Sequence, residues 1–130
     1  MPKGLNDVLW GEFVFDEIFD IYATGSGIDK NKLLSTKGLT PYVTRSDKSN
    51  GIDFFIGEQN EKYSEDIGNV ITIGLDTQTV FYQSHSFYTG QNIQILVNDK
   101  LTRSSALFLI PLIKKQLELI HWHYGIVQTI

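Results

Sequence analysis

The chain has 130 residues, a net charge of −4 and no cysteine, which excludes a disulfide framework and a thiolate metal site. Its 42% hydrophobic content is too high for a disordered tail, and its length predicts a single domain over residues 1–130. The longest apolar run, residues 106–113, is too short to cross a bilayer, and residues 1–7 lack the apolar centre of a signal peptide. We therefore expect a cytoplasmic protein with no membrane partner.

Charge is distributed unevenly along the chain. Residues 30–50 contain five of the eleven basic residues and a single acidic residue, Asp47, so this segment has a net charge of +4. The negative net charge of the whole chain argues against a nucleic-acid ligand, whereas the positive charge of residues 30–50 argues for one. On charge alone, a solvated surface explains such a basic stretch equally well.

The N-terminal third combines an amphipathic segment with polar loops. Apolar residues and the acidic pair Asp16 and Glu17 predict a short helix over residues 15–22, which ends in the glycine-rich residues 23–27. The Gly-x-Gly at 25–27 lacks the third glycine of a dinucleotide-binding motif and does not follow a strand, so we interpret it as a loop. Residues 28–39 are expected to form a lysine-bearing loop or a short helix.

The middle of the chain has the composition of a sheet and the end that of a helix. Runs of β-branched and aromatic residues predict five strands, at residues 41–44, 53–56, 69–75, 79–83 and 92–97. A turn at 76–78 joins the third strand to the fourth, and residues 84–90 are expected to form a loop. From about residue 102 the apolar period becomes helical, with a kink or a new segment at Pro111, and residues 124–130 resemble a further strand.

These elements predict an α+β fold with a twisted, mainly antiparallel sheet, a short N-terminal helix and a longer C-terminal helix. The apolar stripe of the C-terminal helix consists of Leu107, Ile110, Ile113, Leu117 and Ile120. The predicted core consists of Trp10, Phe13, Phe19, Ile71, Ile73, Leu107, Ile110 and Leu117.

The most informative segment is the polar loop that follows the first predicted strand. It is closed by Asn50-Gly51, a strong turn signal because both residues tolerate a positive φ. Side chains that contact phosphates and base edges in DNA fill the rest of the loop. They are Thr44, Arg45, Ser46 and Lys48.

Catalytic and metal-binding patterns are weak. His121 and His123 are two residues apart, which on a helix places them on different faces, and no carboxylate motif accompanies them. No Gly-x-Ser-x-Gly nucleophile motif occurs, and the acidic residues of 53–66 do not have the spacing of a calcium loop. We therefore predict no catalytic residue, no metal and no cofactor, and regard a hydrolase built on the acidic loop as the weakest alternative.

Ordered blocks along the chain resemble a known family. The most specific block is Gly38–Ser46 followed by Asn50-Gly51-Ile52, which contains Tyr-Val-Thr-Arg-Ser. Weaker blocks are residues 15–21, 69–73, 81–83 with 87–88, 106–109 and 124–125. Together they resemble the target-recognition domains of specificity subunits of type I restriction–modification systems and of related fused restriction–methyltransferases.

The resemblance implies an α/β domain that recognises a few base pairs of duplex DNA, with methylation and cleavage carried out by modification and restriction subunits. S-adenosylmethionine would then bind elsewhere. The family's long spacer helices are absent from this sequence, and oligomer formation is compatible with their absence. The expected DNA contacts are Lys30, Lys32, Lys37, Thr44, Arg45, Ser46, Lys48, Asn50, Tyr82, Gln83, His85 and Tyr88.

Structural roles compete with binding roles at several of these positions. Asn50 is equally well explained as a turn former, Tyr82 as a packed strand residue, and Thr44 as a sheet residue. A different function is also open, in which the chain is a protein-interaction module that docks a methyltransferase subunit or associates with itself. The negative net charge of the chain and the apolar C-terminal helix favour that alternative.

Overall fold

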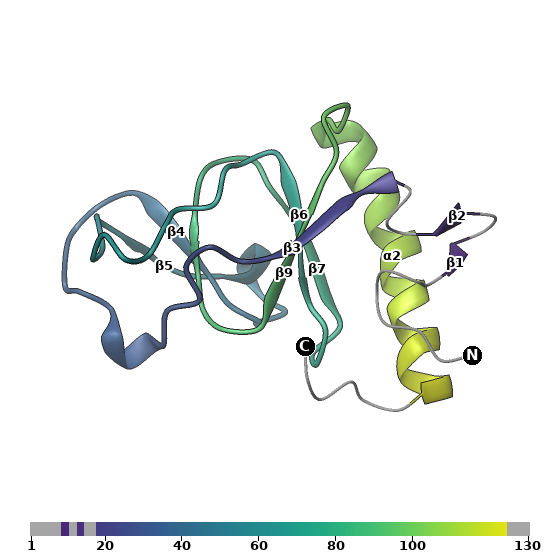
Figure 1. The fold of residues 1–130 in the computed structure, drawn as a ribbon, viewed down its shortest axis with the longest axis horizontal. Coiled ribbons are helices and arrows are strands. Elements are labelled where there is room, and N and C mark those ends of the chain that lie inside the picture. The colour runs from purple at the N-terminus through teal and green to yellow at the C-terminus, as the bar shows by residue number, and fades with distance from the viewer. Residues whose placement is uncertain (1–8, 11–12, 15–17, 125–130) are drawn as a thin grey trace.

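The computed structural model describes residues 9–10, 13–14 and 18–124, and the side chains of residues 18–118 (Figure 1). Predictions that concern Trp10, Phe13, Ile120 or the segment 125–130 lie outside this description. The strands are β1 Leu9–Trp10, β2 Phe13–Val14, β3 Asp20–Ala23, β4 Thr40–Val43, β5 Ile52–Ile56, β6 Val70–Gly74, β7 Thr79–Gln83, β8 Tyr88–Thr89 and β9 Ile93–Val97. The helices are the 3₁₀ turns η2 Lys30–Lys32 and η3 Ser49–Gly51 and the α-helix α2 Arg103–Tyr124.

A four-stranded antiparallel sheet lies at the centre, in the order β3-β9-β6-β7. Its strand β6 is buried along its whole length because both faces of the sheet are covered. Ile71 and Ile73 point to the face that α2 covers and pack with Ile113 and Leu117. The turn at 76–78 joins β6 to β7 as predicted, and β7 is left as the outer strand beside α2.

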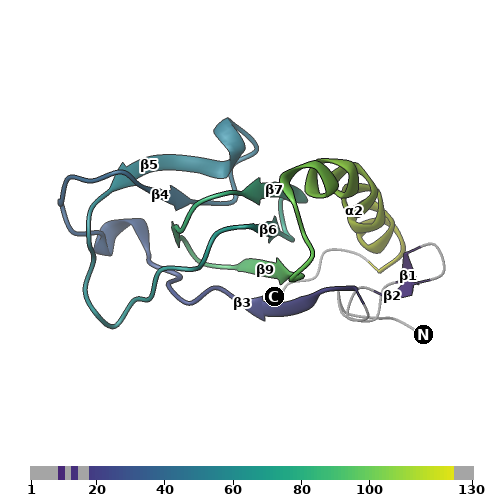
Figure 2. The same cartoon turned by 90° about the horizontal axis from the view of Figure 1, so that it is seen from above.

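A second, three-stranded sheet has the order β5-β4-β8, with β4 antiparallel to β5 and parallel to β8. Val43 and Phe87 from this part of the fold pack with Val70, Ile93 and Ile95 of the central sheet. Figures 1 and 2 show the resulting order of layers, with β4 and β5 at one end, the central sheet in the middle and α2 at the other end. The α+β architecture with a longer C-terminal helix is therefore confirmed.

The predicted helix at residues 15–22 is wrong in its second half. Asp20–Ala23 is β3, in which Asp20, Tyr22 and Ala23 are exposed and Ile21 is partly buried. All four residues pair with β9, and this pairing outweighed the weak helical signal of a short segment. The loop expected at 84–90 contains the short strand β8, which its parallel pairing with β4 creates.

The predicted apolar stripe of α2 is confirmed at Ile110, Ile113 and Leu117 but not at Leu107. Leu107 is 53% exposed, whereas Ala106, Ile113 and Leu117 are buried and Ile110 packs against the core from a partly buried position. The prediction that Leu107 is core is therefore wrong, because α2 turns the neighbouring Ala106, and not Leu107, toward the core. The helix continues through Pro111 as one element.

Candidate nucleic-acid interface

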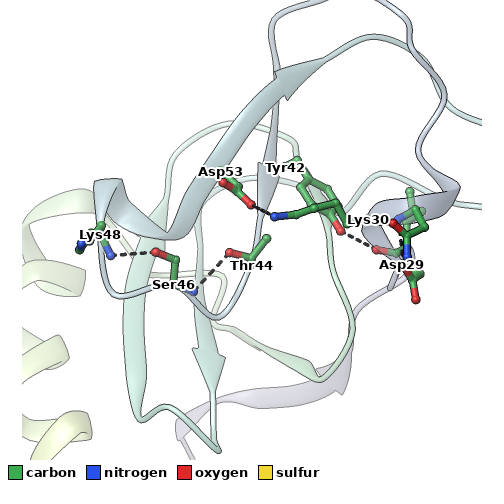
Figure 3. A network of polar contacts seen from close by, with 9 residues as sticks. Asp29, Lys30, Tyr42, Thr44, Ser46, Lys48 and Asp53 are labelled. Carbon is green, nitrogen blue, oxygen red and sulfur yellow. Dashed lines mark hydrogen bonds and ion pairs between the residues drawn. The ribbon is translucent and has the colours of Figure 1, made fainter.

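The loop at residues 44–51 is closed by its own backbone and side chains. Thr44 N–H donates to the carbonyl of Gly51 at 2.8 Å, and Gly51 N–H donates to the carbonyl of Lys48 at 2.9 Å. Asn50 and Gly51 have φ values of 59° and 77°, which confirms the predicted turn. The hydroxyls of Thr44 and Ser46 accept hydrogen bonds from the amides of Ser46 and Lys48 (Figure 3). The loop is thus a defined turn, and both hydroxyls already have a structural role.

The end of this loop is joined to strand β7. Asn50 Nδ2 donates to the carbonyl of Tyr82 at 2.9 Å, and Gln83 Nε2 donates to the carbonyl of Asn50 at 3.0 Å. A Cβ on Gly51 would lie 3.1 Å from the ring of Phe81, so only glycine allows this close approach without displacing the ring. The loop therefore covers the outer strand of the central sheet, and Asn50 and Gln83 connect the two predicted contact segments.

Arg45 lies near the start of the 44–51 loop, at the end away from Asn50 and Gly51. Its guanidinium forms an ion pair with Asp76 from the β6–β7 turn, and each side chain is 38% exposed. A Cβ on Gly74 would lie 2.9 Å from Arg45 Cγ, so the absence of a side chain at Gly74 gives the arginine stem its place. Arg45 is therefore held at both its stem and its charged end.

A cleft of about 490 Å³ lies beside Arg45, and we call it the loop cleft. Lys30 lies in its wall, with Nζ 2.7 Å from Asp53 Oδ2 and 5.2 Å from the centre of the Phe54 ring (Figure 3). The polar residues that line the cleft include Asp29, Lys30, Thr44, Arg45, Ser46 and Asp53. The cleft thus combines four predicted contact residues with two acids that the sequence analysis did not assign to the site.

Tyr42 lies in the cleft wall behind these charges. Its hydroxyl donates to the carbonyl of Ile28 at 2.5 Å. Burial, followed by the charges of Asp29 and Asp53, raises the pKa of Tyr42 to about 12. The phenol consequently stays protonated near neutral pH and acts as a hydrogen-bond donor, not as a base.

The structure separates the remaining predicted lysines. Lys48 precedes η3 at the start of β5, whereas the backbone of Lys37 packs against Gly57, just beyond the other end of β5. Five strand residues span about 16 Å, so these two lysines do not belong to one compact patch. Lys32, Lys37 and Lys48 are exposed, and none forms an ion pair with another described residue.

The second predicted segment, residues 83–89, is only partly on the surface. Gln83 and Tyr88 are each 3% exposed, and Tyr88 Oη accepts a hydrogen bond from Gln59 N–H. Tyr82 donates its hydroxyl to Asn69 Oδ1 at 2.7 Å, in keeping with its alternative interpretation as a packed strand residue. His85 is exposed. Direct DNA contacts by Gln83 and Tyr88 are therefore not supported by their positions.

Sequence reasoning missed the acidic partners of the cationic residues. Asp53 and Asp76 lie outside the basic segment, in a strand and a turn. No local pattern marks them, because the fold alone brings them to Lys30 and Arg45. Within the described residues, no group of three or more His, Cys, Asp or Glu side chains is arranged to hold a metal ion. The helices described there are also too short or too polar to cross a membrane.

Comparison with known proteins connects this fold to a family. The family model described as "Type I restriction modification DNA specificity domain" matches residues 7–129. The chain is 31% identical over 125 residues to a protein of Heyndrickxia coagulans described as "Type II restriction enzyme BgcI specificity subunit S.BcgI". That match covers 95% of this chain and 36% of the relative, so the chain spans little more than a third of that protein's length.

A solved structure has the same fold. The HsdS subunit from Thermoanaerobacter tengcongensis superposes with a TM-score of 0.51 at 13% identity, over 88% of this chain and 29% of that chain. The family model covers almost all of the chain and describes a specificity domain, not a catalytic one. The chain therefore belongs to the family of type I restriction–modification DNA specificity domains.

Proposed function

We propose that this chain recognises a short sequence in double-stranded DNA and serves as the specificity component of a restriction–modification system. Membership of the specificity-domain family carries the proposal, and the 44–51 loop supplies the chemistry. Methylation and cleavage would be carried out by modification and restriction subunits, with S-adenosylmethionine bound there. Such a system works on DNA in the cytoplasm.

Arg45 is the best candidate for reading a base. A guanidinium presents five N–H donors in one plane, and a pair of them matches O6 and N7 of guanine. Asp76 engages the Nη1 end, which leaves the remaining donors for a ligand. Because the ion pair and the stem at Gly74 fix the side chain before binding, less conformational freedom is lost when the base is bound.

Lys30, Thr44 and Ser46 line the loop cleft with Arg45, and Lys48 belongs to the same loop, so these residues fit a role in holding phosphates. Lys32, Lys37 and His85 lie further out and would add weaker electrostatic attraction. Asn50 is placed as a turn former that contacts β7. The proposed base-reading residue is thus Arg45 alone, with the others positioning the backbone of the duplex.

The proposal is tested by selection from a random duplex library with the full chain, alone and together with a methyltransferase subunit. We expect one motif to be enriched, and Arg45→Ala to flatten preference at one or two of its positions by about 1–3 kcal/mol. Lys62→Ala is the control, because Lys62 lies over Tyr63 in the acidic 57–68 loop. If no motif is enriched under either condition while the chain still binds the subunit, the chain is a docking module instead.

A further inference from the structure

The structure contains a second depression on the other side of the 44–51 loop, and we call it the helix groove. It has a volume of about 360 Å³ and lies between β7 and α2. Its polar rim consists of Asn50, Ser84, Arg103 and Lys114, and its floor includes the apolar side chains of Phe81 and Ile110. Asn50 lines the helix groove, whereas Thr44, Arg45 and Ser46 line the loop cleft, so the two ends of the loop contribute to the two depressions.

Arg103 and Lys114 lie on the same side of α2. Eleven residues correspond to three turns plus about 20°, and to about 16 Å along the axis. Both side chains are exposed, and no described acidic side chain lies within ion-pairing distance of either one. This contrasts with Lys30 and Arg45 in the loop cleft, which are paired with Asp53 and Asp76. Arg103 and Lys114 therefore add unpaired positive charge on α2 to that of Lys48 in the loop.

We propose that the helix groove binds the sugar–phosphate backbone of the DNA strand that flanks the 44–51 loop, with Arg103 and Lys114 on its phosphates. This inference rests on the proposed function and adds a phosphate-binding surface to it. Sugar edges suit the apolar floor and phosphate oxygens suit the cationic rim. A spacing of about 16 Å is several times the axial rise of about 3.4 Å per phosphate of one strand, so the two cations reach different phosphates.

The residues around the helix groove support the DNA backbone as its ligand. Asn50 on the rim belongs to the same loop as Arg45, so a duplex read by Arg45 passes close to α2. Residues 84–86 are exposed and follow β7 at the other side of the groove. The 44–51 loop would then enter a groove of the duplex, and the loop cleft and the helix groove would each bind sugar–phosphate backbone beside it.

Adjacent lysines on α2 provide a matched comparison. Lys115 is exposed like Lys114 but does not line the groove, because one residue turns the helix by about 100°. We expect Arg103→Gln and Lys114→Gln each to weaken binding to cognate and scrambled duplexes by the same factor, and to reduce the slope of log K against log salt by about 0.9. Lys115→Gln should leave that slope nearly unchanged.

Amine acetylation of the wild-type chain gives a second measurement that does not depend on the folding of a variant. Mass spectrometry should show that duplex DNA protects Lys114 and leaves Lys115 and Lys62 reactive. If Lys114 reacts equally with and without bound DNA, and Lys114→Gln behaves as Lys115→Gln, the groove is not a phosphate site.

The failure of this inference is distinct from the failure of the proposed function. If a motif is selected and depends on Arg45, but Arg103 and Lys114 have no effect, DNA recognition stands and the helix groove is overturned. Protection of Lys114 by a methyltransferase subunit but not by DNA would assign the groove to a protein partner and also overturn the proposal. If no duplex binds under any condition, both proposals fail together.

Discussion

Arg45 and Asp76 form an ion pair that joins the 44–51 loop to the β6–β7 turn across 31 residues of sequence. Because both side chains are 38% exposed, solvent screens the pair, and its contribution to stability is expected to be below about 1 kcal/mol. Its main consequence is geometric, since it fixes the direction of the guanidinium. Asp76 is thus a positioning residue for Arg45 under the proposed function.

Replacing Asp76 by Asn should raise the affinity for scrambled duplexes and lower the ratio of cognate to scrambled binding. The substitution removes a negative charge that repels phosphates, and it releases Arg45 from its fixed direction. Fluorescence anisotropy titrations at one salt concentration measure both quantities. Asp99→Asn is the control, because it removes the same charge from an exposed position outside the loop cleft. A wild-type discrimination ratio in Asp76→Asn would contradict the positioning role.

A substitution at Asn50 distinguishes a role in forming the turn from a role in reading a base. Asn50→Gly keeps the positive φ but removes the hydrogen bond from Nδ2 to the carbonyl of Tyr82. We expect a loss of about 1 kcal/mol in the free energy of unfolding, and an unchanged base preference in the selected motif. Urea denaturation and sequencing of the selected duplexes measure the two effects. A change of base preference confined to one position would show instead that Asn50 reads a base.

Two leucines of α2 test the packing of the helix against the sheet. Leu117 is 2% exposed and belongs to the core that α2 shares with the central sheet, so Leu117→Ala should lower the free energy of unfolding by about 2–5 kcal/mol. Leu107, at 53% exposure, provides a matched control on the same helix, and Leu107→Ala should change stability by less than about 1 kcal/mol. Equal losses in the two variants would show that the helix faces the sheet differently.

Asp66 makes stability depend on pH. It accepts hydrogen bonds from Thr24 Oγ1 at 2.6 Å and from Gly25 N–H at 3.0 Å, yet burial raises the pKa of its carboxyl above the ordinary value of 3.8. The folded state therefore retains the Asp66 proton to higher pH than the unfolded state does. The associated stabilisation is complete below the unfolded pKa and is lost as the pH rises through the folded pKa.

Asp66→Asn isolates this contribution. Asn resembles the protonated carboxyl, with one acceptor oxygen and one donor group, so the variant should have nearly the same free energy of unfolding as the wild type at low pH. As the pH rises, the variant should become the more stable of the two, because only the wild type must ionise a buried carboxyl. Free energies of unfolding from urea titrations between pH 3.5 and pH 7 measure this change. A wild type that gains stability relative to the variant as the pH rises would mean that the hydrogen bonds outweigh burial.

Local patterns in the sequence determined much of this protein. The strand–turn–strand pattern at 69–83 predicted β6 and β7 because β-branched composition and turn chemistry act over a few residues. Asn50-Gly51 predicted the positive φ values of the loop for the same reason. The ordered blocks around Arg45 also indicated the specificity-domain family that the comparisons show. Each of these features depends on neighbours in the chain.

Tertiary structure alone decided the electrostatics of the site and the faces of several elements. Residues 30–50 have a net charge of +4 in the sequence, but folding brings Asp53 and Asp76 to Lys30 and Arg45, so much of that charge is compensated. Pairing with β9 made Asp20–Ala23 a strand, and the packing of α2 on the sheet left Leu107 exposed. Such outcomes depend on residues far apart in sequence, because charge compensation and burial are set by distances in space and not by spacing along the chain.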